Sequence, residues 1–219
     1  YNRLVPNKDS VINMLFAAHP EPSFKPGEKI EYSNTAYALL AITIERISKQ
    51  SFTDFMKENI FDPLEMHNTQ VLAYVPGDTT TIKNRAYGYW VKNKNTIHEA
   101  EHHYLNCTQG EGGIYSNAPD LAKWDKALYT EKLVSKETLQ EAFRGHVEFK
   151  PKDNLKYGYG WGIREVNGQT TITEHSGGWV GFRTFIWRDI QSKNCIILLC
   201  NNSKRSGLEL ALKRFKKLL

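Results

Sequence analysis

Cysteine and long hydrophobic runs are both scarce in this sequence. Among 219 residues there are three cysteines, an odd number that does not form a disulfide framework. Cys195 and Cys200 lie an odd number of positions apart on a predicted strand, so their side chains point to opposite faces and cannot pair with each other. The longest strongly apolar stretch, residues 195–200, is far too short to span a bilayer. We therefore expect buried thiols, including Cys107, and no transmembrane segment in this sequence.

A strong excess of one charge is also lacking. The chain has 29 basic and 24 acidic residues and a net charge of +5, and apart from residues 213–217 the basic side chains are spread along it. Nucleic-acid binding needs a basic face with interleaved aromatic residues or a known motif, and the sequence shows neither. The basic helix predicted at the C-terminus has an apolar stripe better suited to packing on a sheet than to a membrane surface. We expect no nucleic-acid partner and no membrane contact.

Periodic apolar residues predict that the first part of the chain is mainly helical. Several segments place apolar side chains at helical spacing, and most begin at a Ser, Asn or Asp residue that can cap a helix. Residues 71–115 differ in character, because Tyr87, Tyr89 and Val91 alternate as a strand does and a turn follows at 92–95. The predicted helices are 9–16, 35–49, 51–62, 116–128 and 135–145.

The last third of the chain predicts an antiparallel sheet. Residues 157–166 lead into Asn167-Gly168, the strongest short hairpin signal, and residues 169–174 return beside them. A second hairpin is expected from 182–189 and 194–199, and the amphipathic helix follows. Helices followed by an antiparallel sheet and a covering helix indicate an α+β fold.

Three ordered segments carry the resemblance to a known family. They are Pro26–Tyr37, which contains Tyr-Ser-Asn; Gly110–Trp124, which begins Gly-Glu-Gly-Gly; and Glu174–Phe182, which contains His-Ser-Gly-Gly. They resemble the second motif, the connecting loop and helix, and the third motif of the serine β-lactamase and penicillin-binding protein superfamily, with histidine in place of the more familiar lysine. The sequence is most similar to the bacterial branch of class C β-lactamases, D-alanyl-D-alanine carboxypeptidases and esterases. The likeness extends from about Pro22 to the C-terminus.

The resemblance implies a β-lactamase/transpeptidase-like fold that this sequence contains only in part. The segment before Tyr32 is too short to supply both the serine-lysine helix and the N-terminal strands of that fold. We therefore predict one incomplete domain, mainly helical over 1–156 and made of strands and the terminal helix over 157–219. By the same resemblance we expect the whole protein to be periplasmic or extracellular, although no targeting signal opens this chain.

Tyr32 and Asn34 are the candidate catalytic residues of the first segment. In an acyl transfer by serine, Tyr32 would accept the hydroxyl proton, and it needs neighbouring positive charge to do so near neutral pH. Asn34 would present its amide to the substrate carbonyl. The simpler interpretations are a core tyrosine and a helix cap made by Ser33 or Asn34.

His175 is the catalytic candidate of the third segment, and Ser176, Gly177 and Gly178 are its substrate-binding candidates. The resemblance places His175 on the strand beside the site, where the imidazole can be neutral or charged near neutral pH. Ser176 would bind the carboxylate or acyl side of the substrate. The glycines would let the backbone come close, and the amide of Gly178 would hold the oxyanion. The alternative is a glycine-rich hairpin end.

The nucleophile of the family is missing, because none of the serines has a lysine three residues on. The resemblance therefore implies a serine hydrolase acting on a peptide, β-lactam or ester, with its nucleophile outside this chain, which alone is predicted inactive. A non-catalytic relative that binds a ligand or partner is the alternative. Neither interpretation requires a cofactor. Lost sheet strands would also leave an exposed edge, so we expect self-association.

A zinc site is the remaining alternative. His98-Glu-Ala-Glu-His102 fits the zinc-protease pattern H-E-x-x-H, and His103 follows it. That chemistry needs a long helix presenting both histidines on one face and a third ligand. The polar segments on either side favour at most a short helix, so we prefer a solvated polar segment and expect no metal.

Overall fold

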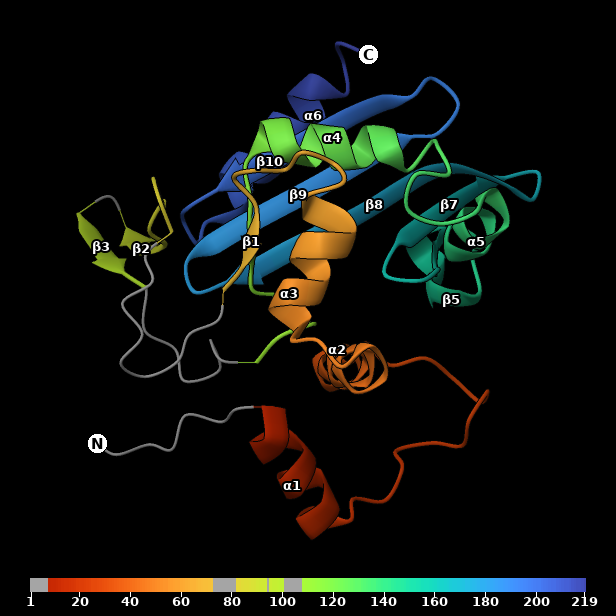
Figure 1. Cartoon of the computed structure of the whole chain (residues 1–219). Helices are drawn as coiled ribbons and strands as arrows, with labels where there is room; N and C mark the ends of the chain where they lie inside the picture. Colours follow the sequence, from red (N-terminus) through yellow and green to blue (C-terminus); the bar gives the residue numbers. More distant parts are fainter. Residues whose placement is uncertain (1–7, 73–81, 94, 101–107) are drawn as a thin grey trace. The chain divides into compact units, whose positions relative to one another are not determined.

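The computed structural model describes residues 8–72, 82–93, 95–100 and 108–219 (Figure 1). The chain divides into two compact units, the first made of residues 1–83 and 102–120 and the second of 84–101 and 121–219. Each unit therefore draws on two separate stretches of the sequence. Within the described ranges, no helix combines the length and the apolar character that crossing a membrane requires.

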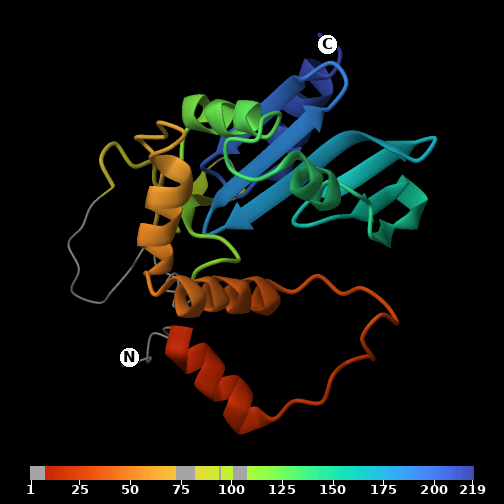
Figure 2. The ribbon, with the colours of Figure 1, turned by 45° about the vertical axis from the view of Figure 1, so that its right-hand side comes forward.

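The first unit is built mainly from helices, which Figure 2 shows in red and orange. Ser33 and Ser51 cap the second and third of them, since their hydroxyls accept hydrogen bonds at 3.1 Å from the backbone N–H of Ala36 and Asp54. The helix predicted over 51–62 changes to π-helical hydrogen bonding after Met56, a change that the apolar spacing does not predict. The elements are α1 (Lys8–Ala18), α2 (Asn34–Ser48), α3 (Phe52–Met56), η1 (Lys57–Phe61), β1 (Gln70–Val71) and β4 (Ile114–Tyr115).

Residues from the second stretch complete the first unit. Asp120 is 1% exposed and accepts hydrogen bonds from the backbone N–H of Asn68 at 2.8 Å and from the Thr69 hydroxyl at 3.0 Å. Beside it, the ladder of β1 and β4 pairs Val71 with Ile114. The buried carboxylate thus satisfies polar groups of a segment far earlier in the sequence and ties the two stretches together.

The second unit is a six-stranded antiparallel sheet in the order β10-β9-β8-β7-β6-β5. Asn167 and Gly168 join β7 to β8 with positive φ values of 52° and 74°, which is the two-residue turn expected from their types. The sheet begins at Val147, earlier than the strands expected from residue 157. Its strands are β5 (Val147–Lys150), β6 (Leu155–Tyr157), β7 (Gly162–Val166), β8 (Gln169–Trp179), β9 (Phe182–Asp189) and β10 (Asn194–Cys200).

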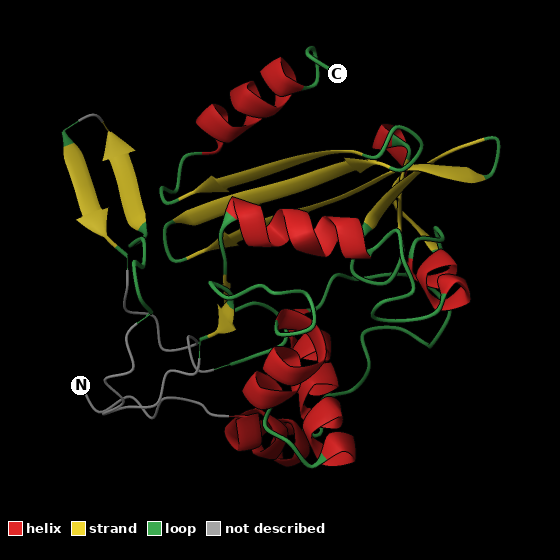
Figure 3. Cartoon of the chain, turned by 45° about the horizontal axis from the view of Figure 1, so that its top comes forward, coloured by secondary structure: helices red, strands yellow, loops and turns green. Residues whose placement is uncertain are grey.

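Helices cover both faces of this sheet. The Lys216 ammonium lies 4.8 Å from the ring centroid of Trp187, whereas Asp125 bonds to Arg188. Because these two β9 residues are consecutive, their side chains point to opposite faces, and Figure 3 shows the two helices on opposite sides of the strands. The covering C-terminal helix and the α+β class are thus as predicted. The helices are α4 (Ala118–Ala127), α5 (Lys136–Ala142), η3 (Pro151–Asp153) and α6 (Arg205–Phe215).

A charged side chain lies at the centre of the second unit. Arg188 is fully buried, and its Nε donates to Asp125 Oδ1 at 2.5 Å. The rings of Tyr129, Phe143 and Trp161 surround the guanidinium, with centroids at 4.8, 5.1 and 5.5 Å. The ion pair and the aromatic contacts together offset the cost of removing this charge from water.

A separate hairpin of β2 (Tyr89–Asn93) and β3 (Thr96–Glu99) belongs to the same unit. The backbone N–H of Tyr89 donates to the carbonyl of Asn201 at 3.0 Å, and the N–H of Ser203 donates to the carbonyl of Tyr89 at 2.9 Å. The hairpin expected around Tyr89 is therefore present, and the segment after β10 holds it in place.

Cys195 and Cys200 on the sheet are free thiols, but they are partly buried rather than fully buried as expected, and Cys107 lies outside the described residues. Burial and the nearby Asp125 carboxylate raise the pKa of the Cys195 thiol to about 12, despite an opposing effect of Arg188. Cys195 is therefore protonated at neutral pH and unreactive as a nucleophile.

Candidate active site

The Tyr-Ser-Asn segment lies at the N-terminus of α2. Ser33 has an extended backbone and caps the helix, so its hydroxyl has a structural role and the Asn34 side chain is not needed as the cap. Asn34 opens the helix with an exposed side chain. Tyr32 is 47% exposed, so among the described residues it is not a core side chain. Both candidates therefore present polar atoms at a helix start rather than to a core.

The Gly-Glu-Gly-Gly loop lies against the same helix. A Cβ at Gly110 would stand 2.5 Å from the Tyr37 carbonyl oxygen and 2.6 Å from the Ala41 Cβ, and its φ is +102°. Only glycine satisfies both the close approach and the backbone conformation. The buried Gln109 amide donates at 3.4 Å to the Thr53 hydroxyl and to the Leu72 carbonyl. The loop is thus fixed to the helix that carries the motif.

The His-Ser-Gly-Gly segment lies in β8, in the last positions before the turn at Val180-Gly181 that joins this strand to β9, so the expected glycine-rich hairpin end is also present. β8 pairs with β7 only as far as Glu174, which is opposite Gly162, but pairs with β9 as far as Trp179. From His175 onward the strand thus extends beyond the β7 ladder, and no described strand pairs with that side of Ser176, Gly177 or Gly178. Such a side can bind an extended substrate or hold an oxyanion with backbone N–H groups.

Side chains of β9 lie directly over the two glycines of this strand. A Cβ at Gly177 would stand 2.4 Å from the Thr184 hydroxyl oxygen, and one at Gly178 would stand 1.9 Å from Arg183 Nη1. The Arg183 side chain is itself held by a hydrogen bond from its Nε to the Ser203 carbonyl at 3.3 Å. The two glycines therefore leave the space that these neighbouring side chains occupy.

The His175 imidazole is half-buried and in contact with Tyr157 of β6. The Tyr157 hydroxyl is 3.0 Å from His175 Nε2, and the two rings meet edge to face with centroids 6.2 Å apart. Burial lowers the pKa of His175 below its ordinary value, and a hydrogen bond with the Ser176 backbone acts in the opposite direction. At neutral pH the ring is consequently uncharged, whereas a lysine at this position would carry a charge.

The contact between Tyr157 and His175 was not predicted from the sequence. On the chain Tyr157 reads as one more apolar position at the start of a strand, and its distance in sequence from the motif hides the hydrogen bond. Tyr32 and Asn34 belong to the first unit and His175–Gly178 to the second. That these residues converge on one cleft stays a prediction.

The zinc pattern is not on a helix where the structure describes it. His98 lies on strand β3, opposite Trp90 in the ladder with β2, and its side chain is exposed. His102 and His103 fall outside the described residues. Among the residues that are described, no three His, Cys, Asp or Glu side chains are grouped so that they could hold a metal ion. The zinc alternative requires a helix at His98, and the structure contradicts it there because His98 lies on a strand.

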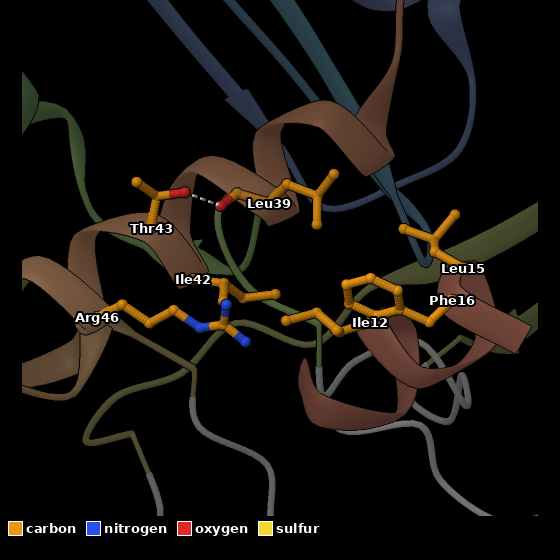
Figure 4. Close-up of a pocket in the computed structure, with 7 residues that line it drawn as sticks. All are labelled: Ile12, Leu15, Phe16, Leu39, Ile42, Thr43 and Arg46. Carbon is orange, nitrogen blue, oxygen red and sulfur yellow. Dashed lines mark hydrogen bonds between the residues drawn. The ribbon is translucent and has the colours of Figure 1, made fainter. Parts of the chain in front are cut away.

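A hollow of about 420 Å³ lies in the first unit, between α1 and α2 (Figure 4). Its lining is apolar except for Thr43 and Arg46, and the Thr43 hydroxyl is occupied by a hydrogen bond to the Leu39 carbonyl at 2.8 Å. None of the motif residues lines it, so it offers no groups for acyl transfer. The full lining is Ile12, Leu15, Phe16, Leu39, Ile42, Thr43 and Arg46.

Comparison with known proteins identifies the family. Residues 9–218 match the family described as Beta-lactamase, so the chain belongs to this family of serine hydrolases of the β-lactamase and penicillin-binding type. It is similar to penicillin-binding protein 4* of Bacillus subtilis (strain 168), with 32% identity over 96% of this chain and 48% of that protein. The chain spans less than half the length of the curated relatives it matches.

Solved structures agree with the fold. The octameric penicillin-binding protein homologue from Pyrococcus abyssi superposes with a TM-score of 0.78 and 26% identity, over 92% of this chain and 45% of that one. The D-amino acid amidase from Ochrobactrum anthropi SV3 superposes with a TM-score of 0.74 and 22% identity, over 92% and 57%. The β-lactamase/penicillin-binding-protein fold predicted from the three motifs is thus confirmed.

Proposed function

We propose that this chain is the C-terminal part of a serine hydrolase that forms an acyl-serine intermediate with a peptide, β-lactam or ester, and that the nucleophile lies on a segment outside it. The observation that carries the proposal is the course of β8. In a member of this family, its His-Ser-Gly-Gly segment extends beyond the β7 ladder, where an oxyanion and an extended substrate can be bound.

The proposed reaction assigns a step to each motif. The serine oxygen attacks the substrate carbonyl carbon while its proton passes to Tyr32, and the carbonyl oxygen becomes an oxyanion held by the Gly178 N–H. The oxyanion collapses, the bond to the leaving group breaks, and Tyr32 returns the proton to that group. Asn34 and Ser176 hold the carbonyl and acyl portions. Water then hydrolyses the acyl-serine ester.

The charge that Tyr32 needs does not come from His175 in this proposal. A tyrosine acts as a base near neutral pH only beside positive charge, and burial keeps the His175 ring neutral by lowering its pKa. The lysine of a Ser-x-x-Lys segment would supply the charge. The chain therefore needs that segment for the proton acceptor as well as for the nucleophile.

Covalent labelling tests the proposal. Penicillin and a fluorophosphonate probe are added to the 219-residue chain alone and to the same chain joined to the upstream segment of its parent reading frame. We expect no labelling of the chain alone and stoichiometric labelling of the longer protein at a serine followed three residues later by lysine. Labelling of the isolated chain would contradict the proposal.

A matched pair of variants tests the role of Tyr32. Tyr32 and Tyr87 are both 47% exposed, so each phenylalanine substitution removes one hydroxyl from a residue of equal overall exposure. In the completed enzyme, Tyr32→Phe should slow acylation by about 10²-fold or more, whereas Tyr87→Phe should leave it unchanged. Equal rates for the two variants would remove Tyr32 from the mechanism.

The second candidate is a non-catalytic relative that binds a ligand or partner through the same strand. The absence of Ser-x-x-Lys from this sequence favours it. An upstream reading frame that also lacks this pattern, together with reversible binding of a peptide and no labelling, would support this candidate. A periplasmic or extracellular location is proposed on the family resemblance alone, and fractionation of cells expressing the whole protein tests it.

A further inference from the structure

The contact between Tyr157 and His175 is built into the sheet. Gly162 of β7 pairs with Tyr157 on one side and with Glu174, the residue before His175, on the other. The phenol ring is also packed against Phe149, with centroids 5.1 Å apart. Tyr157 is therefore fixed by its strand and by a neighbouring ring when its hydroxyl meets His175 Nε2 at 3.0 Å.

A hydrogen bond with the Ser176 backbone is another polar contact of the His175 ring. It raises the pKa of His175 and so favours the protonated ring. A backbone group with that effect must be an acceptor, and the carbonyl oxygen is the acceptor available. Since the Tyr157 hydroxyl lies against Nε2, Nδ1 is the ring nitrogen left to donate to this carbonyl. A neutral ring that donates from Nδ1 has an unprotonated Nε2, which accepts from the tyrosine hydroxyl.

We propose that Tyr157 is a positioning residue that holds His175 as the neutral Nδ1–H tautomer, with its ring fixed beside the substrate side of β8. The inference rests on the proposed function, because it specifies the state in which His175 enters that site. Other charged groups near the ring have their own partners: Glu174 is paired with Arg164 at 3.0 Å, and Arg188, beyond Ile186 on β9, is bonded to Asp125. We therefore assign the tautomer to Tyr157 acting at Nε2 together with the Ser176 carbonyl.

Nitrogen NMR of the histidine-labelled chain tests the proposal without any activity. In the wild type at neutral pH, His175 Nε2 should resonate in the unprotonated, pyridine-like region and Nδ1 in the protonated, pyrrole-like region. Tyr157→Phe keeps the ring packing on Phe149 and deletes the hydroxyl, so the Nε2–H form should become populated and both signals should move. A wild-type ring protonated at Nε2 would overturn the proposal whether or not the variant folds.

Tyr159→Phe is the matched control. Tyr159 lies two positions further along, and its ring stacks on His146 with centroids 4.7 Å apart. We expect this variant to leave the His175 tautomer unchanged. If Tyr159→Phe and Tyr157→Phe move the His175 signals equally, the effect is a general loss of packing and the proposal fails.

Kinetics of the completed enzyme supply a second measurement. Because a wrong tautomer impairs a positioned imidazole, Tyr157→Phe should lower kcat by about tenfold or more, leave KM nearly unchanged, and alter the pH profile of kcat. A confirmed tautomer in an enzyme that never acylates would overturn the proposed function alone. An active enzyme in which Tyr157→Phe changes neither the His175 tautomer nor the pH profile of kcat would overturn this inference alone.

Discussion

At Gly178 the space above the strand is filled by one side chain. A Cβ there would stand 1.9 Å from Arg183 Nη1 and 3.0 Å from its Cζ, so Gly178→Ala must displace the guanidinium and break its hydrogen bond to Ser203. Because the displaced atoms are the flexible end of the side chain, we expect a loss of only about 1 kcal/mol in the free energy of unfolding. Urea denaturation measures it.

A double-mutant cycle identifies the cause of that loss. In an Arg183→Ala background the obstacle is gone, so Gly178→Ala should cost close to nothing. Gly112→Ala is the control, because a Cβ at Gly112 meets nothing within 4 Å. An unchanged cost of Gly178→Ala in the Arg183→Ala background would mean that the clash with Arg183 is not the cause of the loss.

Acid should destabilise the chain partly through His175. Burial lowers the pKa of His175 in the folded state, so below about pH 6.5, the ordinary pKa of histidine, the unfolded chain binds the proton more readily. Stability from this group is therefore intact above that pH and falls as the pH drops toward the lowered folded pKa. In His175→Gln the loss of unfolding free energy between about pH 7.5 and 5.5 should be smaller.

The exposed His98 on β3 provides the comparison for this pH effect. His98→Gln removes an imidazole from the same unit without removing a buried ring, and we expect it to keep the acid sensitivity of the wild type. Identical pH dependence in the wild type and His175→Gln would show that His175 does not contribute.

Among the elements, α4 is joined to the sheet by the buried pair of Asp125 and Arg188. Their exposed side-chain fractions are 8% and 0%, so Asp125→Asn leaves a guanidinium buried without its counter-charge. Removing one partner of such a pair costs about 3–5 kcal/mol, and we expect a loss near the lower end because asparagine keeps one acceptor. Chemical denaturation followed by tryptophan fluorescence measures it, since Trp161 lies against Arg188.

An exposed pair in the same unit is the control. Glu141 and Arg144 approach to 2.6 Å, but their side chains are 41% and 63% exposed. Glu141→Gln should therefore change the unfolding free energy by less than about 0.5 kcal/mol. If both substitutions cost the same, burial is not what gives the Asp125–Arg188 pair its importance.

The elements that the sequence predicts are those whose signals are local. Ser51 and Ser135 cap helices as expected, and Asn167-Gly168 turns a hairpin, because capping and turn formation depend on residues within a few positions. Strand β5 and the π-helical turn after Met56 were not predicted. A short strand is defined by its partner rather than by its own sequence, and apolar spacing does not distinguish π-helical from α-helical hydrogen bonding.

The candidate site is predictable to the same extent. Motif resemblance selects Tyr32, Asn34 and the His175–Gly178 segment because their order along the chain is informative. The buried Arg188 left no distinctive signal, because β9 also carries Arg183 and Asp189 and the aromatic rings around the Arg188 guanidinium are distant in sequence. The bond from Tyr157 to His175 left none, because only the sheet register brings these residues together.

For the molecule as a whole, exposed apolar side chains predict self-association. On α1 and α2, Phe16 is 68% exposed, Leu40 55% and Ile47 78%, and β10 is an end strand of the sheet. Both features invite contact between copies. We expect sedimentation velocity to show association that grows with concentration and weakens in Ile47→Glu.

Two outcomes refine or reject this prediction. Leu199 on β10 is 44% exposed, so association that persists in Ile47→Glu but disappears in Leu199→Lys would assign the contact to the sheet edge. A monomer that unfolds cooperatively at every concentration would contradict the prediction altogether.

The alternation of the two units along the chain affects how the protein emerges from the ribosome. The first unit cannot bury Asp120 against Asn68 until the β2–β3 hairpin has already been synthesised, and that hairpin must wait for Asn201–Ser203, which are made later still. The second unit therefore cannot finish folding until well after the first has been synthesised in full. A ribosome stalled between residues 120 and 200 should carry a protease-resistant first unit and a hairpin that is still cleaved.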